Sequence, residues 1–290
     1  MNVELVRVLT RDGVRLDGAY ERVREPRARI GDVLCLHGAA GNFYSGAMFE
    51  RLVEPLRDRG WGVLRVNTRG HDGYFPTRTA AGPARLGAAY ERVGDCEQDV
   101  TAWLDWLAGR GAPRAVVLGH SLGAIKALHS QVHARHALAR GIIAISPPRL
   151  SAGLFRSNAP ERFLPTLEEA ERRIAEGQPR AILESPFPFP MLITAESFRD
   201  KYGAEAYHIV DQVRSLAIPA GFIYGARELV DANAAFAELP EILADHVSDR
   251  RLLRFEIIPD ADHFYVGYQE SLNAAVLAMI DWIGGPGSAS

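Results

Sequence analysis

The chain has 290 residues, of which 47% are hydrophobic and 24% are charged, so it can bury a large core. This composition excludes a disordered or fibrous protein. The formal net charge of −3 comes from intermixed acidic and basic residues without a basic run, so nucleic acid is not an expected partner.

The stretch from Met1 to Asp17 alternates charged and apolar residues and has no apolar stretch or cleavage site of a secretory signal. No apolar run approaches the roughly 20 residues that a membrane-spanning helix needs. Cys35 and Cys96 are too few for a disulfide framework, and both are expected to be reduced. We therefore expect a soluble, cytoplasmic protein, and the sequence carries no signal for an oligomeric state.

Short apolar runs alternate with amphipathic helical stretches along most of the chain, which is typical of a parallel sheet covered by helices. Residues 4–9 and 14–20 flank the turn Arg11-Asp12-Gly13 and predict an antiparallel hairpin. Later runs predict strands buried on both faces of the sheet, at residues 33–36, 62–66, 115–118, 142–145, 221–224 and 253–258.

This alternation is interrupted by a proline-rich stretch, residues 147–200, which contains the aromatic run Phe187-Pro188-Phe189-Pro190. A segment of this kind between a strand and the next helix predicts an insertion over one edge of the sheet. We therefore predict an α/β fold with a core at residues 1–146 and 201–283 and a helical cap at residues 147–200. Residues 284–290 are expected to be a flexible tail.

A candidate nucleophile lies in Gly119-His120-Ser121-Leu122-Gly123, between the predicted strand 115–118 and a helical stretch. The two glycines remove the Cβ clashes of a sharp strand-to-helix turn, which would present the Ser121 hydroxyl above the sheet. Glycine and serine are common in turns, so a plain turn is the alternative. The order of strand, motif and helix favours a nucleophile.

A serine hydroxyl needs a base. His263 follows the last predicted strand, at the sheet end where the sites of parallel sheets collect. We expect His129, His133 and His136 to be surface residues on or just past the helix after the nucleophile, and His120 to take part in local packing or hydrogen bonds. His263 is therefore the expected base.

The base in turn needs a carboxylate to orient it and to stabilise its charged form. Glu228 and Asp231 both follow the predicted strand 221–224. Glu228 is the first choice because it takes the acid position of a Gly-x-x-acid turn, whereas Asp231 could cap a helix beginning near Ala232. Asp262 adjoins the base and is expected to be a structural loop residue.

Acyl transfer also needs donors for the oxyanion of the transition state. The amide of Leu122 at the start of its helix is one candidate. The amide of Ala39, in the loop that begins at His37-Gly38, is the other. His37 is expected to brace this loop by hydrogen bonds and not to react.

No metal or organic cofactor is expected, because the sequence has no His-Glu-x-x-His helix, no paired cysteine ligands and no dinucleotide-binding glycine pattern. The expected partner is a small-molecule ester, thioester or lactone. Aromatic side chains of the cap could contact its apolar part, although each of them could equally pack the cap against the core. These side chains are Phe155, Phe163, Phe187 and Phe189.

Five motifs follow one another along the chain: His37-Gly38, residues 67–73, residues 119–123, residues 225–228 and Asp262-His263-Phe264. This set of motifs, in this order, resembles the α/β-hydrolase superfamily, and above all its capped serine esterase and lipase-like branch. The resemblance implies a serine hydrolase that cleaves a carboxylic ester through an acyl-enzyme. A serine in the turn argues against the branches with an aspartate nucleophile, and Glu228 departs from the commoner aspartate. Amide, carbon–carbon or peptidase-type cleavage, or a receptor with little turnover, is the alternative.

Overall fold

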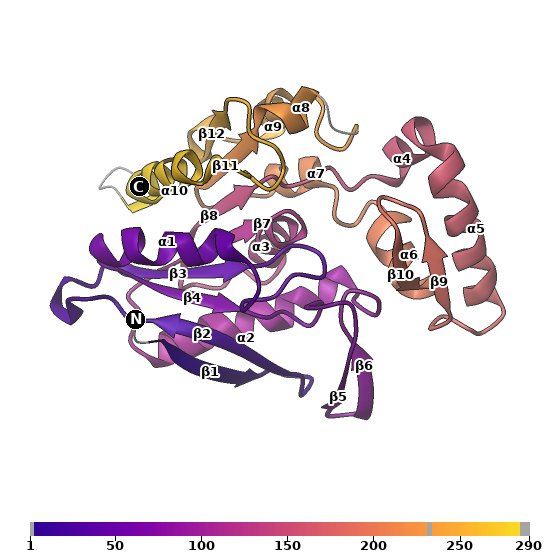
Figure 1. The fold of residues 1–290 in the computed structure, drawn as a ribbon, viewed down its shortest axis with the longest axis horizontal. Coiled ribbons are helices and arrows are strands. Elements are labelled where there is room, and N and C mark those ends of the chain that lie inside the picture. Colours follow the sequence, from indigo (N-terminus) through magenta and orange to yellow (C-terminus); the bar gives the residue numbers. More distant parts are fainter. Residues whose placement is uncertain (1–2, 231–233, 285–290) are drawn as a thin grey trace.

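The computed structural model describes residues 3–230 and 234–284. An eight-stranded sheet runs through it in the order β1-β2-β4-β3-β7-β8-β11-β12 (Figure 1). β2 pairs antiparallel with both β1 and β4, and all the other neighbours pair parallel. The mostly parallel sheet predicted from the sequence is therefore confirmed.

Every predicted strand is present in this sheet. The strands are β1 (Glu4–Leu9), β2 (Arg15–Glu21), β3 (Gly31–Leu36), β4 (Trp61–Val66), β7 (Ala115–His120), β8 (Ala139–Ile145), β11 (Ala220–Gly225) and β12 (Leu253–Ile258). The prediction that β12 is buried on both faces was wrong. β12 lies at the edge of the sheet, where Leu253 and Phe255 pack partly against the core and Ile257 is exposed.

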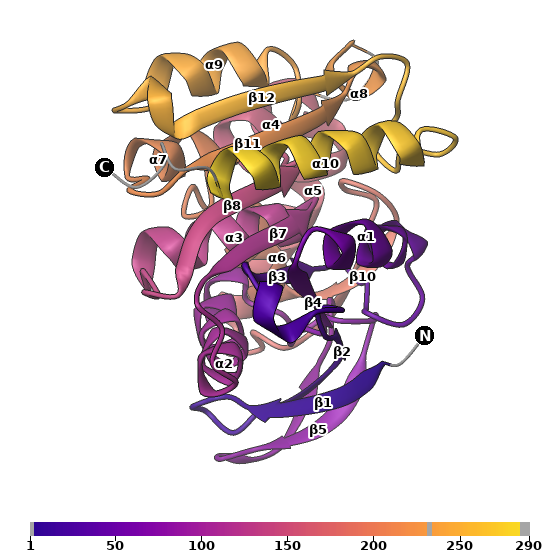
Figure 2. The same ribbon diagram turned by 90° about the vertical axis from the view of Figure 1, so that its left-hand side faces the viewer.

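Helices cover both faces of the sheet (Figure 2). One face carries α1 (Ala47–Asp58) and α10 (Gln269–Gly284), and the other carries α2 (Cys96–Gly109), α3 (Leu122–His133), α7 (Ile209–Arg214) and α9 (Leu239–His246). The described residues also include the short 3-10 helices η1 (Pro26–Ala28), η2 (Val93–Asp95) and η3 (Arg250–Leu252). Each face has its own apolar core, and both cysteines are buried free thiols.

Of the tail predicted at residues 284–290, only Gly284 is among the described residues, and it ends α10. Within the described part of the chain, no helix has the length and apolar character needed to cross a membrane.

Between β8 and α7 the chain leaves the sheet. It forms α4 (Ala152–Asn158), α5 (Pro160–Ala175), β9 (Ile182–Ser185), β10 (Met191–Thr194) and α6 (Ala195–Tyr202). This inserted segment, residues 152–202, lies beyond the carboxyl ends of the parallel strands (Figure 1). It is not wholly helical as predicted, because the run Phe187-Pro188-Phe189-Pro190 connects two paired strands of four residues each.

A second hairpin, β5 (Phe75–Thr79) and β6 (Gly82–Leu86), was not predicted. Its strands contain Pro76 and Pro83 and have no buried face. Proline occurs in sheets mainly on edge strands, and within an apolar run it argues against a strand. This explains why the hairpin was missed.

A buried ion pair anchors the loop after β4 to α2. The guanidinium of Arg69 donates to Asp99 Oδ1 at 2.8 and 3.0 Å, and the Arg69 backbone N–H donates to Asp99 Oδ2 at 2.8 Å. Both residues are buried, and Arg69 also donates to Asp12 at 2.8 Å. Removal of the guanidinium would leave a buried carboxylate without its counter-charge.

Replacement of Arg69 by methionine is expected to lower the free energy of unfolding by about 3–5 kcal/mol, as measured by urea denaturation. Arg251→Met is the matched control, because Arg251 pairs with Asp249 at 2.8 Å on the exposed surface. This control should not change the urea midpoint. Equal midpoints for the two variants would show that the Arg69 pair does not anchor the loop.

Candidate active site

Ser121 lies in the tight turn between β7 and α3. Its backbone has φ 55° and ψ −123°, a conformation that non-glycine residues adopt only under strain. A Cβ at Gly119 would overlap the carbonyl of Gly123, and a Cβ at Gly123 would overlap the carbonyl of Leu36. Only glycines allow β3, β7 and α3 to pack this closely, and this packing enforces the turn that exposes Ser121.

A hydrogen bond joins the loops that follow the last two strands of the sheet. Glu228 lies on the short helix α8 (Ala226–Val230), and His263 lies in the loop after β12. His263 Nδ1 is 2.8 Å from Glu228 Oε2. Because an ionised carboxylate only accepts, Nδ1 carries the hydrogen and Nε2 remains free to accept a proton. Glu228 is buried, while the side chain of His263 is 26% exposed.

His120 connects the His263 loop to the turn that carries Ser121. Burial, followed by the proximity of His263, lowers the pKa of His120 to about 3, so its ring is neutral. Its Nε2 is 2.9 Å from the backbone oxygen of His263 and donates to it, and the two rings lie 4.9 Å apart. The structure therefore brings Ser121, His263 and Glu228 to the same end of the sheet, and His120 has the local role predicted for it.

Two groups that the sequence analysis missed hold Glu228 in place. The Ser146 hydroxyl donates to Glu228 Oε1 at 2.5 Å, and the Gly225 N–H donates to the same oxygen at 2.8 Å. The second bond is half of a capping box, because Glu228 is the third residue of the helix that follows Gly225. The Tyr265 hydroxyl lies 2.8 Å from Ser146 Oγ. Only the position of Ser146 directly after a predicted strand could have signalled this role.

The loop after β3 runs beside Ser121, since a Cβ on Gly38 would lie 3.2 Å from the Cβ of Ser121. The Thr68 N–H donates to His37 Nε2 at 3.1 Å, so His37 carries its hydrogen on Nδ1 and donates it to the Gly38 oxygen at 2.8 Å. The C=O and N–H of a trans peptide point in opposite directions, so this bond turns the amide of Ala39 away from His37. His37 braces the loop as predicted.

The amide of Leu122 occupies the first position of α3. The N–H groups in the first turn of a helix have no acceptor within that helix, and the helix dipole favours negative charge there. Leu122 and Ala39, the two predicted oxyanion donors, thus belong to the two segments that flank Ser121.

The sequence profile of the alpha/beta hydrolase family matches residues 33–278. The chain belongs to the alpha/beta hydrolase family. The matched range contains Ser121, Glu228 and His263 together with the loop after β3. No curated protein sequence matches this hydrolase.

Solved structures share the fold over nearly the whole chain. Est1E from Butyrivibrio proteoclasticus with ferulic acid bound has a TM-score of 0.69 and 15% identity, covering 97% of this chain and 100% of that chain. GrgF from Penicillium sp. sh18 has a TM-score of 0.72 and 14% identity, covering 97% and 98%. The Pyrococcus furiosus esterase Pf2001 has a TM-score of 0.60 and 19% identity, covering 98% and 92%. Because these identities are low, the similarity shows that the hydrolase shares the fold of these structures and shows nothing about its substrate.

Other predicted positions have different outcomes. Asp231, the alternative acid, lies outside the described residues. The prediction of a surface position was wrong for His129, which is buried with Nε2 3.1 Å from Glu97 Oε1, because α2 covers that part of α3. Asp262 is a structural loop residue, since its carboxylate accepts the backbone N–H groups of Phe264 and Val266 at 3.0 and 3.2 Å.

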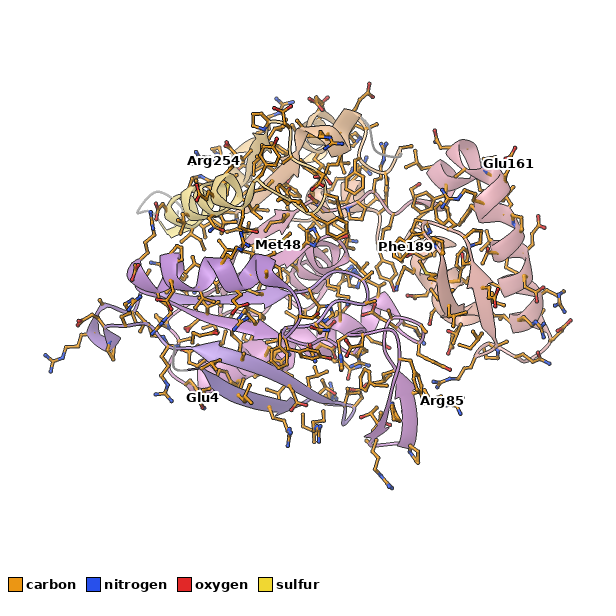
Figure 3. The ribbon with its side chains drawn as sticks, viewed as in Figure 1. Glu4, Met48, Arg85, Glu161, Phe189 and Arg254 are labelled. Carbon is orange, nitrogen blue, oxygen red and sulfur yellow. The ribbon has the colours of Figure 1, made fainter. Side chains whose placement is uncertain are left out.

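The predicted pocket residues of the inserted segment divide into two groups. Phe155, Phe163 and Phe187 are buried against one another, with ring centroids 4.8 to 5.7 Å apart, and form the core of the segment itself. The alternative expected for these rings was packing of the cap against the core, whereas they pack within the segment. Phe189 is 50% exposed and lies on the side of the segment that faces the sheet (Figure 3).

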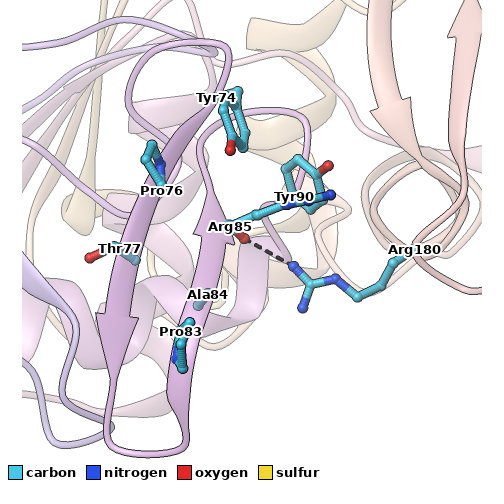
Figure 4. Close-up of a pocket in the computed structure, with 8 residues that line it drawn as sticks. All are labelled: Tyr74, Pro76, Thr77, Pro83, Ala84, Arg85, Tyr90 and Arg180. Atoms are coloured by element: carbon cyan, nitrogen blue, oxygen red, sulfur yellow. Dashed lines mark hydrogen bonds between the residues drawn. The ribbon is translucent and has the colours of Figure 1, made fainter.

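A cavity of about 470 Å³ opens between the β5–β6 hairpin and the inserted segment (Figure 4). Arg180 lies over the Tyr90 ring at 5.2 Å and donates to the Arg85 carbonyl at 3.0 Å. The cavity lining does not include Ser121, Glu228 or His263, so the hydrogen-bonded residues define the candidate site and the cavity does not. Across the described ranges of this hydrolase, no group of three or more His, Cys, Asp or Glu side chains could hold a metal ion.

Burial and, to a smaller extent, the nearby Lys126 lower the pKa of His37, and the bond to Gly38 opposes the shift, so that the pKa is about 3. The ring is therefore expected to stay neutral, with its hydrogen on Nδ1, from pH 5 to pH 8. Long-range ¹H–¹⁵N correlation spectra should show this tautomer without titration for His37. A titration near the ordinary histidine pKa of roughly 6.5, or an Nε2–H tautomer, would contradict this geometry.

Proposed function

We propose that this hydrolase cleaves a carboxylic ester, thioester or lactone through an acyl-enzyme on Ser121. The observation that carries the proposal is the 2.8 Å bond between His263 Nδ1 and Glu228 Oε2. The loop that carries His263 is also bonded to His120, which directly precedes Ser121. The bond to Glu228 leaves Nε2 of His263 as the available base. The strained turn supports it, because an exposed serine at the end of a buried strand is the usual form of such a nucleophile.

In the proposed first step, Ser121 Oγ attacks the carbonyl carbon and His263 Nε2 takes the hydroxyl proton. The carbonyl π electrons move to oxygen, and the amides of Leu122 and Ala39 donate to the oxyanion. Its collapse expels the alcohol or thiol, which takes the proton from His263. Glu228 remains ionised throughout and stabilises the imidazolium.

In the second step, water attacks the acyl-enzyme while His263 takes one of its protons. The new oxyanion collapses, Ser121 leaves with the proton returned by His263, and the carboxylic acid is released. The enzyme is restored, with one water consumed for each acyl bond cleaved.

We further propose that residues 147–200 form a cap over a core made of residues 1–146 and 201–283. The aromatic cluster gives the inserted segment its own apolar core, so this segment can hold its shape beyond the sheet. Phe189 faces the sheet and is exposed, so we assign it to contact with the apolar part of the substrate. Such a contact favours substrates that carry an aliphatic or aromatic group beside the scissile bond.

The purified protein is expected to hydrolyse short p-nitrophenyl esters, and Ser121→Ala should abolish this turnover, because no other group then forms the acyl-enzyme. Release of p-nitrophenol measures the reaction, and circular dichroism shows whether the variant is folded. Turnover retained by the folded variant would exclude Ser121 as nucleophile. Stable ester binding to the wild type without product release would instead favour a receptor.

Ser146→Ala is expected to lower kcat roughly tenfold with little change in KM, because Glu228 loses one of the donors that orient it for His263. Steady-state kinetics on the same esters measure the effect. Ser130→Ala is the control, because Ser130 is also buried and, within the described part of the chain, its hydroxyl bonds only to the Ala127 carbonyl in its own helix. Equal kcat values for the two variants would contradict the positioning of Glu228 by Ser146.

A further inference from the structure

A buried ionic cluster lies where the inserted segment meets the core. Glu91, Lys126 and Lys201 are 1%, 0% and 2% exposed. Lys126 on α3 forms an ion pair with Glu91 Oε1, and Lys201 Nζ on α6 is 3.5 Å from Glu91 Oε2. The cluster thus holds two ammonium groups and one carboxylate, with a net charge of one positive unit.

The Glu91 carboxylate remains ionised in the folded protein. Burial raises the pKa of Glu91, but Lys126 and Lys201 more than offset this and lower it to about 2. Apolar side chains of similar volume often give equal or better stability than a buried ion pair. Stability alone therefore does not account for three charges at this position, which points to a role in fixing the neighbouring loop that carries Thr68.

A chain of hydrogen bonds leads from Lys126 to the loop beside Ser121. Lys126 Nζ donates to Thr68 Oγ1 at 2.9 Å, and Thr68 Oγ1 lies 3.2 Å from His37 Nε2. An ammonium group only donates, so the hydroxyl accepts from Lys126 and directs its own hydrogen to His37 Nε2, whose one lone pair it shares with the Thr68 N–H at 3.1 Å. His37 then donates to the Gly38 carbonyl at 2.8 Å. The donors all point the same way, which strengthens each bond in the chain.

The cluster also fixes the position of the loop that carries Thr68. Gly70 lies directly against the Glu91 carboxylate, and a Cβ at Gly70 would overlap that group. Lys126 forms an ion pair with Glu91 Oε1, the atom nearest to a Cβ at Gly70, and this pair holds the carboxylate against the loop. Thr68 is therefore held from two directions, by the bond from Lys126 and by the contact of Gly70 with Glu91.

We propose that Lys126 is a positioning residue for the loop after β3, which carries the Ala39 amide. It acts through Thr68 and His37 on the Gly38–Ala39 peptide, and Glu91 holds its ammonium group in place. This inference rests on the proposed function, in which the Ala39 amide donates to the oxyanion. Lys201 also forms an ion pair with Glu91, but among the described residues it has no hydrogen bond to Thr68. We therefore assign Lys201 to the packing of α6 against the core.

Lys126→Met and Lys201→Met form a matched pair of variants. Each removes one buried ammonium group and leaves a neutral pair, Glu91 with the remaining lysine. Lys126→Met is expected to lower kcat for p-nitrophenyl esters by roughly ten- to a hundredfold with KM within about twofold, because the donor is misplaced for the transition state. Lys201→Met should keep kcat within about threefold of the wild type. Equal losses in the two variants would overturn the proposal.

Thr68→Val and Thr68→Ser test the same chain without a change of charge. The valine variant removes the hydroxyl and should match Lys126→Met in kcat, whereas the serine variant keeps the hydroxyl and should restore it. The double variant Lys126→Met/Thr68→Val should lose no more than either single variant, because both interrupt one chain. Wild-type kcat in Thr68→Val, or additive losses in the double variant, would contradict the relay.

Hydrogen exchange separates this inference from the proposed function. Exchange in a peptide covering residues 37–42 should be faster in Lys126→Met and Thr68→Val than in Lys201→Met and the wild type. This readout needs no turnover, so it tests the positioning even if Ser121→Ala shows that the ester activity does not depend on Ser121. Unchanged exchange at residues 37–42 in both relay variants would refute the inference.

Discussion

The close approach of β3, β7 and α3 is the constraint on which the candidate site depends. Gly119 and Gly123 permit it, and it forces Ser121 into a strained turn beside the loop that starts at His37. Because the turn is over-determined by packing, it can retain a backbone conformation that would otherwise cost about 1–3 kcal/mol. The same packing sets the amide at the start of α3 and the loop after β3 on either side of one hydroxyl.

Around this rigid turn, the other side chains are oriented by hydrogen bonds. Glu228 receives bonds from Ser146 and Gly225 through one oxygen and binds His263 with the other. On the opposite side, His37 turns the Gly38–Ala39 peptide, and Thr68 and Lys126 stand behind it. Each group that we propose to react thus has a buried partner that fixes its direction, which is what preorganisation of a transition state requires.

The sheet could be predicted from the sequence because strands of a parallel sheet are continuous apolar runs. The turn at Ser121 could be predicted because a strand, a glycine, a serine and a helix follow one another in a fixed order. The sequence could not predict Ser146 or Lys126. A serine at a strand end and a lysine on a helix look ordinary in a sequence, and their roles arise only when distant segments meet. The β5–β6 hairpin was missed because Pro76 and Pro83 argue against a strand. The exposed face of β12 was missed although Arg254 and Glu256 alternate with Leu253 and Phe255, which is the pattern of a strand with one exposed face.

Reaction with a fluorophosphonate, followed by peptide mapping, tests the central claim most directly, since it reports both the nucleophile and its activation. The account predicts a phosphonyl group on Ser121 of the wild-type protein, formed at least about a hundredfold more slowly in His263→Ala, because the hydroxyl then lacks its base. Labelling at another residue, or an unchanged rate in the folded His263→Ala variant, would contradict it.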